Sequence, residues 1–284
     1  MSYELGTIFN KLRKQRQKAL IPYFTALYPS AKVFEQSVIA ATDAGVDPVR
    51  SGHLGDNPTN GNSKSWTPYA SNGADIIEIG LPFSDPLADG PVIQHSSHYA
   101  LMHGFTIERM FKSIRRLRGK TKTPLVIMTY INPVLRYGVS RFMRECRNSG
   151  VSGLIIPDLI PEEGGLIEKA AALNKIAINY LIAPTTPIAR IRLIAARTTG
   201  FIYLVSVAGV TGERRGIPAY LPAVVKRIRR ITDKPVCIGF GISTPDQARA
   251  MARLCDGVII GSALVKRTNP SAVRRFLKKV RQQL

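Results

Sequence analysis

The feature that most constrains this chain is a regular alternation of short apolar runs with longer amphipathic stretches. Eight apolar or β-branched runs occur, at residues 19–25, 74–80, 124–130, 152–158, 176–182, 201–207, 235–241 and 256–262. Near-continuous apolar strands separated by helical patterns are typical of a parallel sheet buried on both faces. Because such a sheet closes at eight β/α units, the pattern predicts an α/β fold, a single (β/α)8 TIM barrel. An open doubly wound sheet is the alternative.

Two segments depart from this alternation. At the N-terminus, apolar residues at helical spacing predict an extra amphipathic helix before the first strand, and no apolar core of a signal peptide is present; these residues are Leu5, Ile8, Phe9 and Leu12. Residues 48–73 are rich in Gly, Pro, Asn, Ser and Thr and lack periodicity, which predicts an irregular insertion before the second strand. We expect one TIM-barrel domain over residues 1–284, with the insertion on the face away from the βα loops.

The chain is strongly basic, with a formal net charge of +21. Lysines and arginines cluster in residues 109–122, 214–230 and 273–284, where apolar residues recur between them every three or four positions. This pattern fits the solvated faces of surface helices, and nonspecific attraction of polyanions stays open. Neither zinc-finger spacing nor an aromatic ribonucleoprotein motif occurs, so we expect no specific nucleic-acid binding.

Other compositional features narrow the class of protein further. No run approaches the roughly 18 apolar residues of a membrane helix, so we expect no membrane association. The three cysteines, Cys146, Cys237 and Cys255, are far apart and show neither metal-ligand spacing nor a disulfide framework. We therefore predict no metal site and a reducing, cytoplasmic location.

Three carboxylates cluster in a basic chain, within the stretch DIIEIGLPFSDPLADGP at residues 75–91. Glu78 lies near the end of the second predicted strand, and Asp85 and Asp89 lie in the loop that follows, which is where TIM barrels carry catalytic groups. Two carboxylates in one cavity can hold different pKa values and divide acid and base work. Alternatively, Glu78 is a satisfied core carboxylate and the two aspartates stabilise turns.

Glycines end successive strands late in the chain. Gly241 follows the seventh predicted strand, and Gly261 with Ser262 follows the eighth. Barrels commonly bind phosphate in these loops, because glycine lets backbone N–H groups approach an anion closely. The glycines therefore predict a phosphorylated substrate whose reacting end points toward Glu78 and Asp89.

Five motifs together resemble one known family. IEIGLPFSDPLADGPVIQ, PLVIMTYINPV, GLIIPDLIPEE, VSVAGVTGERR, and IGFGIS with GVIIGSALVK are similar, in order and spacing, to the tryptophan synthase alpha chain over nearly the whole sequence apart from the insertion. The resemblance implies a TIM-barrel lyase that cleaves indole-3-glycerol phosphate to indole and glyceraldehyde 3-phosphate by a retro-aldol reaction. It implies no cofactor in this chain and a beta chain partner, in an alpha2-beta2 tetramer, that carries pyridoxal phosphate and joins the indole to serine.

The resemblance also implies roles for individual residues. Glu78 and Asp89 match the family's catalytic carboxylates, with Glu78 as the proton shuttle and Asp89 holding the indole N–H, and Asp85 matches a position near the beta chain interface. Substrate-binding positions are matched by Tyr23, Tyr130, Tyr203, Thr211, Gly212, Gly241, Gly261 and Ser262. Thr211 matches a residue that reaches toward the catalytic aspartate when its loop closes.

The chain departs from the family at Leu27, where relatives usually carry glycine. If the backbone there needs a positive φ, the leucine strains it. Two alternatives to the subunit interpretation remain: a stand-alone lyase with high activity of its own, and a noncatalytic barrel with a polyanion-binding or interaction role.

Overall fold

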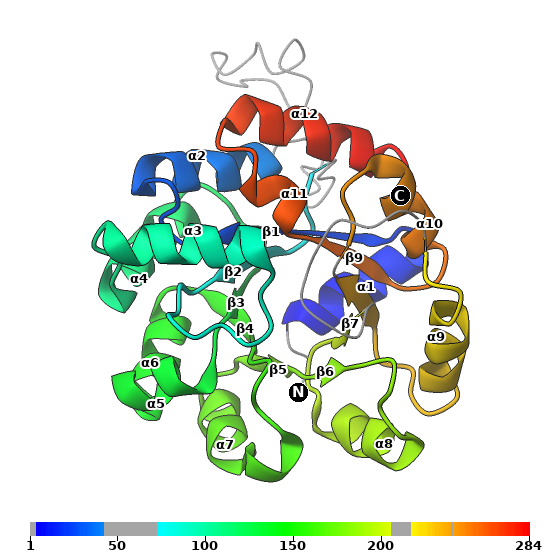
Figure 1. Cartoon of the computed structure of the whole chain (residues 1–284). Helices are drawn as coiled ribbons and strands as arrows, with labels where there is room; N and C mark the ends of the chain where they lie inside the picture. Colours follow the sequence, from blue (N-terminus) through cyan, green and yellow to red (C-terminus); the bar gives the residue numbers. More distant parts are fainter. Residues whose placement is uncertain (1–3, 43–72, 206–216, 240) are drawn as a thin grey trace, which may run out of the picture.

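The computed structural model describes residues 4–42, 73–205, 217–239 and 241–284. Its nine strands are all parallel and form one sheet in the order β5-β4-β3-β2-β1-β9-β8-β7-β6, curled into a ring (Figure 1). The strands are Ala19–Thr25 (β1), Ile77–Gly80 (β2), Leu125–Met128 (β3), Val151–Ile155 (β4), Ala177–Asn179 (β5), Leu181–Ile182 (β6), Ile202–Val205 (β7), Val236–Gly239 (β8) and Gly257–Ile260 (β9). The predicted TIM barrel is confirmed.

All helices except the first, which lies across one end of the barrel, surround the ring on its outside. The helices are Glu4–Lys14 (α1), Ala31–Thr42 (α2), Pro91–Met102 (α3), Ile107–Arg118 (α4), Ile131–Tyr137 (α5), Val139–Asn148 (α6), the short 3-10 turn Pro161–Glu163 (η1), Gly165–Leu173 (α7), Ile188–Arg197 (α8), Leu221–Arg229 (α9), Pro245–Ala252 (α10), Ser262–Val265 (α11) and Pro270–Arg281 (α12). None of the helices in the described ranges is long and apolar enough to cross a membrane.

The fifth predicted strand is two short strands, β5 and β6, on either side of Tyr180. β5 pairs with β4, whereas β6 pairs with β7, so the two halves of one apolar run serve different neighbours. The backbone N–H of Tyr203 donates to the carbonyl of Tyr180 at 3.0 Å, and that of Phe201 donates to the side chain of Asn179 at 2.8 Å. These bonds link the two edges of the sheet and nearly close the barrel.

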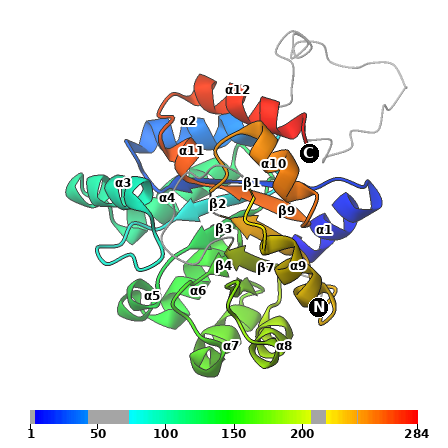
Figure 2. The ribbon, with the colours of Figure 1, turned by 45° about the vertical axis from the view of Figure 1, so that its right-hand side comes forward.

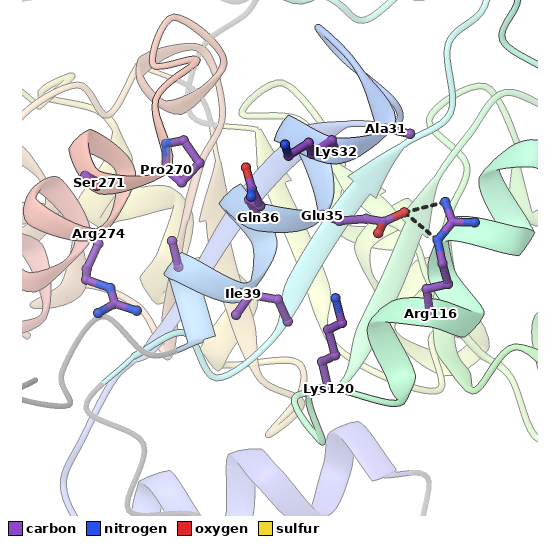
Figure 3. A pocket seen from close by; sticks show the side chains of 11 residues that line it. Ala31, Lys32, Glu35, Gln36, Ile39, Arg116, Lys120, Pro270, Ser271 and Arg274 are labelled. Atoms are coloured by element: carbon purple, nitrogen blue, oxygen red, sulfur yellow. Dashed lines mark hydrogen bonds and ion pairs between the residues drawn. The ribbon is translucent and has the colours of Figure 1, made fainter. Parts of the chain in front are cut away.

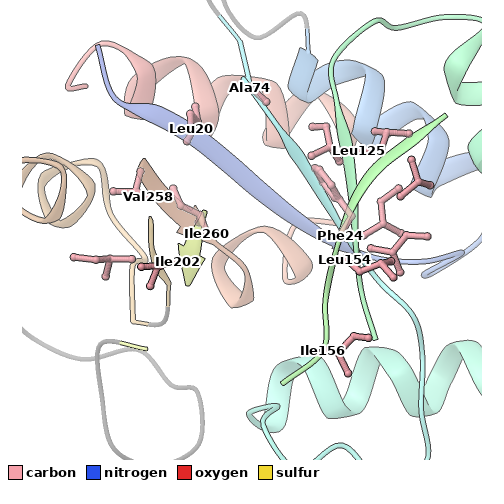
Figure 4. Close-up of a cluster of buried hydrophobic side chains, with 14 of the residues drawn as sticks. Leu20, Phe24, Ala74, Leu125, Leu154, Ile156, Ile202, Val258 and Ile260 are labelled. Atoms are coloured by element: carbon pink, nitrogen blue, oxygen red, sulfur yellow. The ribbon is translucent and has the colours of Figure 1, made fainter. Parts of the chain in front are cut away.

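Alternation along each strand divides the buried side chains into two clusters. On β1, Leu20 and Phe24 point outward against the helices, and Figure 4 shows them with outward-facing residues of other strands. Ile21 and Tyr23 point inward and join the interior cluster. The same alternation on β2 turns Ile77 and Ile79 outward, which places Glu78 inside the barrel.

Helix α1 closes one end of the interior. Leu5, Phe9 and Leu12 are buried in the interior cluster, and the ring of Phe9 lies 5.7 Å from that of Phe201 between centroids. Figure 2 shows α1 on the side of the barrel away from α3. The predicted N-terminal helix is therefore confirmed, and it leaves the opposite end of the barrel for the strand-end residues.

The backbone enters and leaves residues 43–72 at neighbouring points. The N–H of Ala74 donates to the carbonyl of Ala41 at 3.0 Å, and a Cβ on Gly73 would lie 2.1 Å from the carbonyl oxygen of Thr42. Arg281, on the last helix, donates to the Gly73 carbonyl at 2.7 Å. Almost all of the predicted insertion lies outside the described residues, but Thr42 and Gly73, which flank residues 43–72, lie side by side.

Leu27 follows β1 with φ of +62° and is buried. A left-handed conformation costs a β-carbon residue about 1–2 kcal/mol, which glycine avoids. The strain expected from the sequence at this position is present, and burial of the leucine side chain in the outer cluster offsets it.

Candidate active site

Glu78 lies inside the barrel on β2, beside Tyr23 of β1 in the parallel ladder. Its side chain is 1% exposed, and neither carboxylate oxygen has a hydrogen-bond partner within the described residues. Burial, with a smaller contribution from the charge of Asp89, raises the pKa of Glu78 to about 8. Glu78 therefore holds a proton at neutral pH. Within the part of the chain that the structure describes, the side chain therefore lacks the partners that a satisfied core carboxylate would have.

Asp89 lies in the loop between β2 and α3 and is also buried. Burial raises its pKa to about 6, and a hydrogen bond from the Tyr130 hydroxyl opposes that rise. The same hydroxyl accepts a bond from the N–H of Ala88 at 3.0 Å, which ties the loop to the end of β3. Asp89 is thus mainly ionised at neutral pH, while Glu78 remains mainly protonated.

Two tyrosines face the carboxylates from opposite arcs of the ring. Tyr23 on β1 and Tyr203 on β7 are both buried, and burial followed by the negative charges of Asp89 and Glu78 raises both pKa values well above the ordinary value. Such coupling means that the two hydroxyls lie near both carboxylates. The structure therefore brings together five predicted site residues, the fifth being Tyr130.

The tyrosines depend on glycines that sequence reasoning missed. A Cβ on Gly80, the last residue of β2, would lie 1.9 Å from the Tyr23 hydroxyl oxygen, and one on Gly239, the last residue of β8, would lie 2.2 Å from that of Tyr203. Each glycine leaves the space that a tyrosine of the neighbouring strand fills. In the sequence, the only signal for these two positions was a glycine at the end of a predicted strand.

The predicted phosphate residues lie at the ends of β8 and β9. Gly261 follows β9, and a Cβ there would be 3.4 Å from Ile93 of α3 and 3.8 Å from the Cβ of Tyr23. Ser262 begins α11, which packs against β1 and α3. Gly241 follows β8 with φ of +79°, a conformation that favours glycine. Thr211 and Gly212 lie outside the described residues.

Apolar residues also line the interior beside the carboxylates. Ile93 of α3, Met128 at the end of β3 and Ile155 at the end of β4 belong to the interior cluster that contains Tyr23 and Tyr203. Sequence reasoning did not single them out, because an apolar residue at a strand end looks the same in a core and in a substrate pocket.

Asp85 lies in an exposed loop. Ser84 donates a hydrogen bond to the Asp85 carboxylate at 2.5 Å, and Leu87 in the same loop is 78% exposed. Leu135 after β3 and Ile160 after β4 are 50% and 41% exposed. The segments that follow three neighbouring strands thus each expose one large apolar side chain.

The described residues contain no group of three or more His, Cys, Asp or Glu side chains suited to a metal ion. A protonated and an ionised carboxylate, buried together between aromatic rings, can give and take protons from a flat substrate.

The chain matches known proteins over most of its length. A family model described as tryptophan synthase alpha chain matches residues 53–283. The tryptophan synthase alpha chain of Dehalococcoides mccartyi is 46% identical over 217 residues, covering 75% of this chain and 85% of that protein, and that of Geobacter sulfurreducens is 40% identical over 94% and 90%.

Solved structures agree with the sequence comparisons. A chain of Mycobacterium tuberculosis tryptophan synthase superposes with a TM-score of 0.84 at 31% identity, covering 100% of this chain and 98% of that one. A chain of the tryptophan synthase complex from Pyrococcus furiosus gives a TM-score of 0.77 at 31% identity, over 92% and 97%. With its barrel, its paired carboxylates and these matches, the chain belongs to the tryptophan synthase alpha chain family.

Proposed function

We propose that Glu78 and Asp89 carry the family's lyase reaction, the retro-aldol cleavage of indole-3-glycerol phosphate to indole and glyceraldehyde 3-phosphate. One observation supports this assignment above the others: two carboxylates are buried together with pKa values of about 8 and about 6. Such a separation gives one proton donor and one anion at the same pH, which is what an acid/base pair requires. The reaction uses no cofactor in this chain.

The two carboxylates have different tasks in this proposal. Breaking the C–C bond needs a proton delivered to indole C3 and a proton removed from a glycerol hydroxyl. Glu78 is protonated before the reaction and moves these protons, while Asp89 accepts a hydrogen bond from the indole N–H as positive charge develops on the ring. Burial strengthens both interactions, because little water screens them.

The remaining site residues hold the substrate. Tyr23, Tyr130 and Tyr203 provide aromatic walls for the indole ring. Backbone N–H groups around Gly241, Gly261 and Ser262 bind the phosphate, together with Gly212. Thr211 reaches toward Asp89 when its loop closes over the substrate.

We further propose that a tryptophan synthase beta chain, carrying pyridoxal phosphate, covers the strand-end face in an alpha2-beta2 tetramer. The exposed side chains of Leu87, Leu135 and Ile160 support this, since they lie in the segments that follow the neighbouring strands β2, β3 and β4. All three cysteines are buried and none forms a disulfide bond, which fits action in the reducing cytoplasm.

We also propose that residues 1–284 form one domain in which 48–73 is an insertion dispensable for chemistry. The close approach of Thr42 and Gly73 supports this, because a short link could replace the intervening chain. Deletion of residues 48–72 should leave lyase activity in place. Loss of activity in a deletion variant that still unfolds cooperatively would contradict the proposal.

The experiment that tests the function is release of glyceraldehyde 3-phosphate from indole-3-glycerol phosphate by the purified chain, with and without a beta chain. We expect low activity alone, higher activity with the beta chain, and almost none in Asp89→Asn. High activity without the partner would favour a stand-alone lyase. No activity in either condition, from a folded protein, would contradict the assignment of the carboxylates.

A further inference from the structure

A groove of about 970 Å³ lies on the outside of the barrel, where α2 is flanked by α4 and α12 (Figure 3). Charged and polar side chains line much of it, including Lys32, Glu35, Arg116, Lys120, Ser271 and Arg274. None of these residues belongs to the proposed lyase site. The groove is thus separate from the lyase site. Some of the basic residues behind the net charge of +21 gather there.

The charges in the groove are unbalanced. Glu35, the single carboxylate among the described residues of the lining, accepts hydrogen bonds from the Arg116 guanidinium at 2.5 and 2.9 Å and another from Ser113. Burial raises the pKa of Glu35, but the bonds from Arg116 and Ser113 outweigh it and lower the pKa overall. Glu35 is therefore ionised and neutralised by Arg116.

Two lysines in the groove are not neutralised in this way. Lys32 and Lys120 are exposed, and among the described residues neither donates a hydrogen bond to Glu35 as Arg116 does, although the charge of Lys120 also helps to lower the pKa of Glu35. Arg274 on α12 adds a third cation to the lining. The groove therefore has an excess of positive charge that a bound anion would compensate.

Two helices begin at the groove and add to its positive potential. Ala31 and Lys32 open α2, and Pro270 and Ser271 open α12; each helix has 12 residues. The N-terminal turn of a helix carries a partial positive charge, which favours anions nearby. The helix N-termini and the lysines thus both make the electrostatic potential of the groove more positive.

We propose that this groove binds an oligophosphate chain, with Lys32 and Lys120 as its principal ligands. Lysine is a common point-charge ligand for phosphate. From Lys32 to Ala40, α2 runs about 12 Å along the groove, which is longer than a single phosphate group. Among the described residues that line the groove there is no aromatic ring on which a nucleobase could stack, so the proposal assigns recognition to the phosphates themselves.

The proposal is tested by measuring the binding of inorganic tripolyphosphate to the full chain with calorimetry, in buffer without divalent metal ions. Glyceraldehyde 3-phosphate in excess fills the catalytic phosphate site. The groove variant is Lys32→Ala/Lys120→Ala, and the control is Lys169→Ala/Lys226→Ala, which removes two exposed lysines from α7 and α9. Both variants lose the same charge, and we expect both to retain lyase activity.

We expect the groove variant to bind tripolyphosphate at least ~10-fold more weakly than wild type, and the control to bind within about 3-fold. Added salt should weaken tripolyphosphate binding less in the groove variant than in wild type, since two charge contacts are lost. Equal weakening in the two variants would mean that attraction is spread over the surface and would overturn the proposal.

The source of the phosphates is tested with the same variants. Equal affinity for tripolyphosphate and for ATP supports recognition of the phosphate chain alone, and tighter binding of ATP supports a nucleotide as the source of that chain. A single-stranded oligonucleotide that binds more tightly per phosphate than tripolyphosphate, and loses that binding in the groove variant, would overturn the assignment in favour of nucleic acid.

Discussion

Replacing Glu78 by glutamine should stabilise the protein while it removes activity. Burial holds the pKa of Glu78 at about 8 in the folded chain, against an ordinary value of 4.5. For a carboxyl whose pKa is raised on folding, stability is complete below pH 4.5 and is lost as the pH rises through 8, because the folded state holds the proton more tightly than the unfolded state. Glutamine has a similar shape and no proton to lose.

The magnitude follows from the difference in pKa. A shift of about 3.5 units corresponds to roughly 5 kcal/mol at 1.36 kcal/mol per unit, and about 3 kcal/mol of this develops between pH 5 and pH 8. Glu78→Gln should therefore have a free energy of unfolding that exceeds that of wild type by ~1 kcal/mol at pH 5 and ~4 kcal/mol at pH 8. Lyase activity should fall by at least about 100-fold, the usual contribution of a general acid/base.

Urea denaturation of both proteins, followed by circular dichroism at pH 5, 7 and 8, measures this difference. Glu163→Gln, at an exposed position, is the matched control and should alter stability by less than ~0.5 kcal/mol at every pH. Curves for wild type and Glu78→Gln that stay parallel from pH 5 to pH 8 would refute the reasoning. Glu78 would then titrate like a solvated carboxyl and could not store a proton at neutral pH.

Three further substitutions test the surroundings of the site. Gly80→Ala should destabilise the protein by about 1–3 kcal/mol and raise KM, because its Cβ would overlap the Tyr23 hydroxyl; unchanged kinetics would contradict this packing. Tyr130→Phe removes the hydrogen bond that lowers the pKa of Asp89, so the acidic limb of the pH–rate profile should move above its wild-type position near pH 6. Leu27→Gly should be more stable than Leu27→Ala by about 1 kcal/mol in urea denaturation, the reverse of the usual order, because φ is +62°.

The architecture was predictable because it depends on a local pattern repeated many times. Each apolar run overlaps a strand of the ring, and β1 has the predicted bounds of residues 19–25. The exception is the run at 176–182, which is divided at Tyr180 because its halves pair with different neighbours at the closure of the ring. Such a division depends on the geometry of barrel closure, and the hydrophobic pattern of the sequence does not indicate it.

The site was predictable in part. Glu78 and Asp89 could be found because a barrel places strand ends and the following loops on one face, so their position in the sequence gave their position in the fold. Gly80 and Gly239 could not, because each acts through a tyrosine on a neighbouring strand. A contact across strands has no periodic signature along the chain.

The sequence by itself determined the barrel, the inward direction of Glu78 and the strand ends that bear glycine, because alternation and turn chemistry are local properties of the chain. Only the tertiary structure decided that Glu78 and Asp89 have separate pKa values, since desolvation depends on what surrounds a carboxyl from every side. The tertiary structure likewise placed the start of α2 with Lys32, Lys120 after α4, and the start of α12 around one groove. These residues are far apart in the chain, and only packing of the helices on the barrel brings them together.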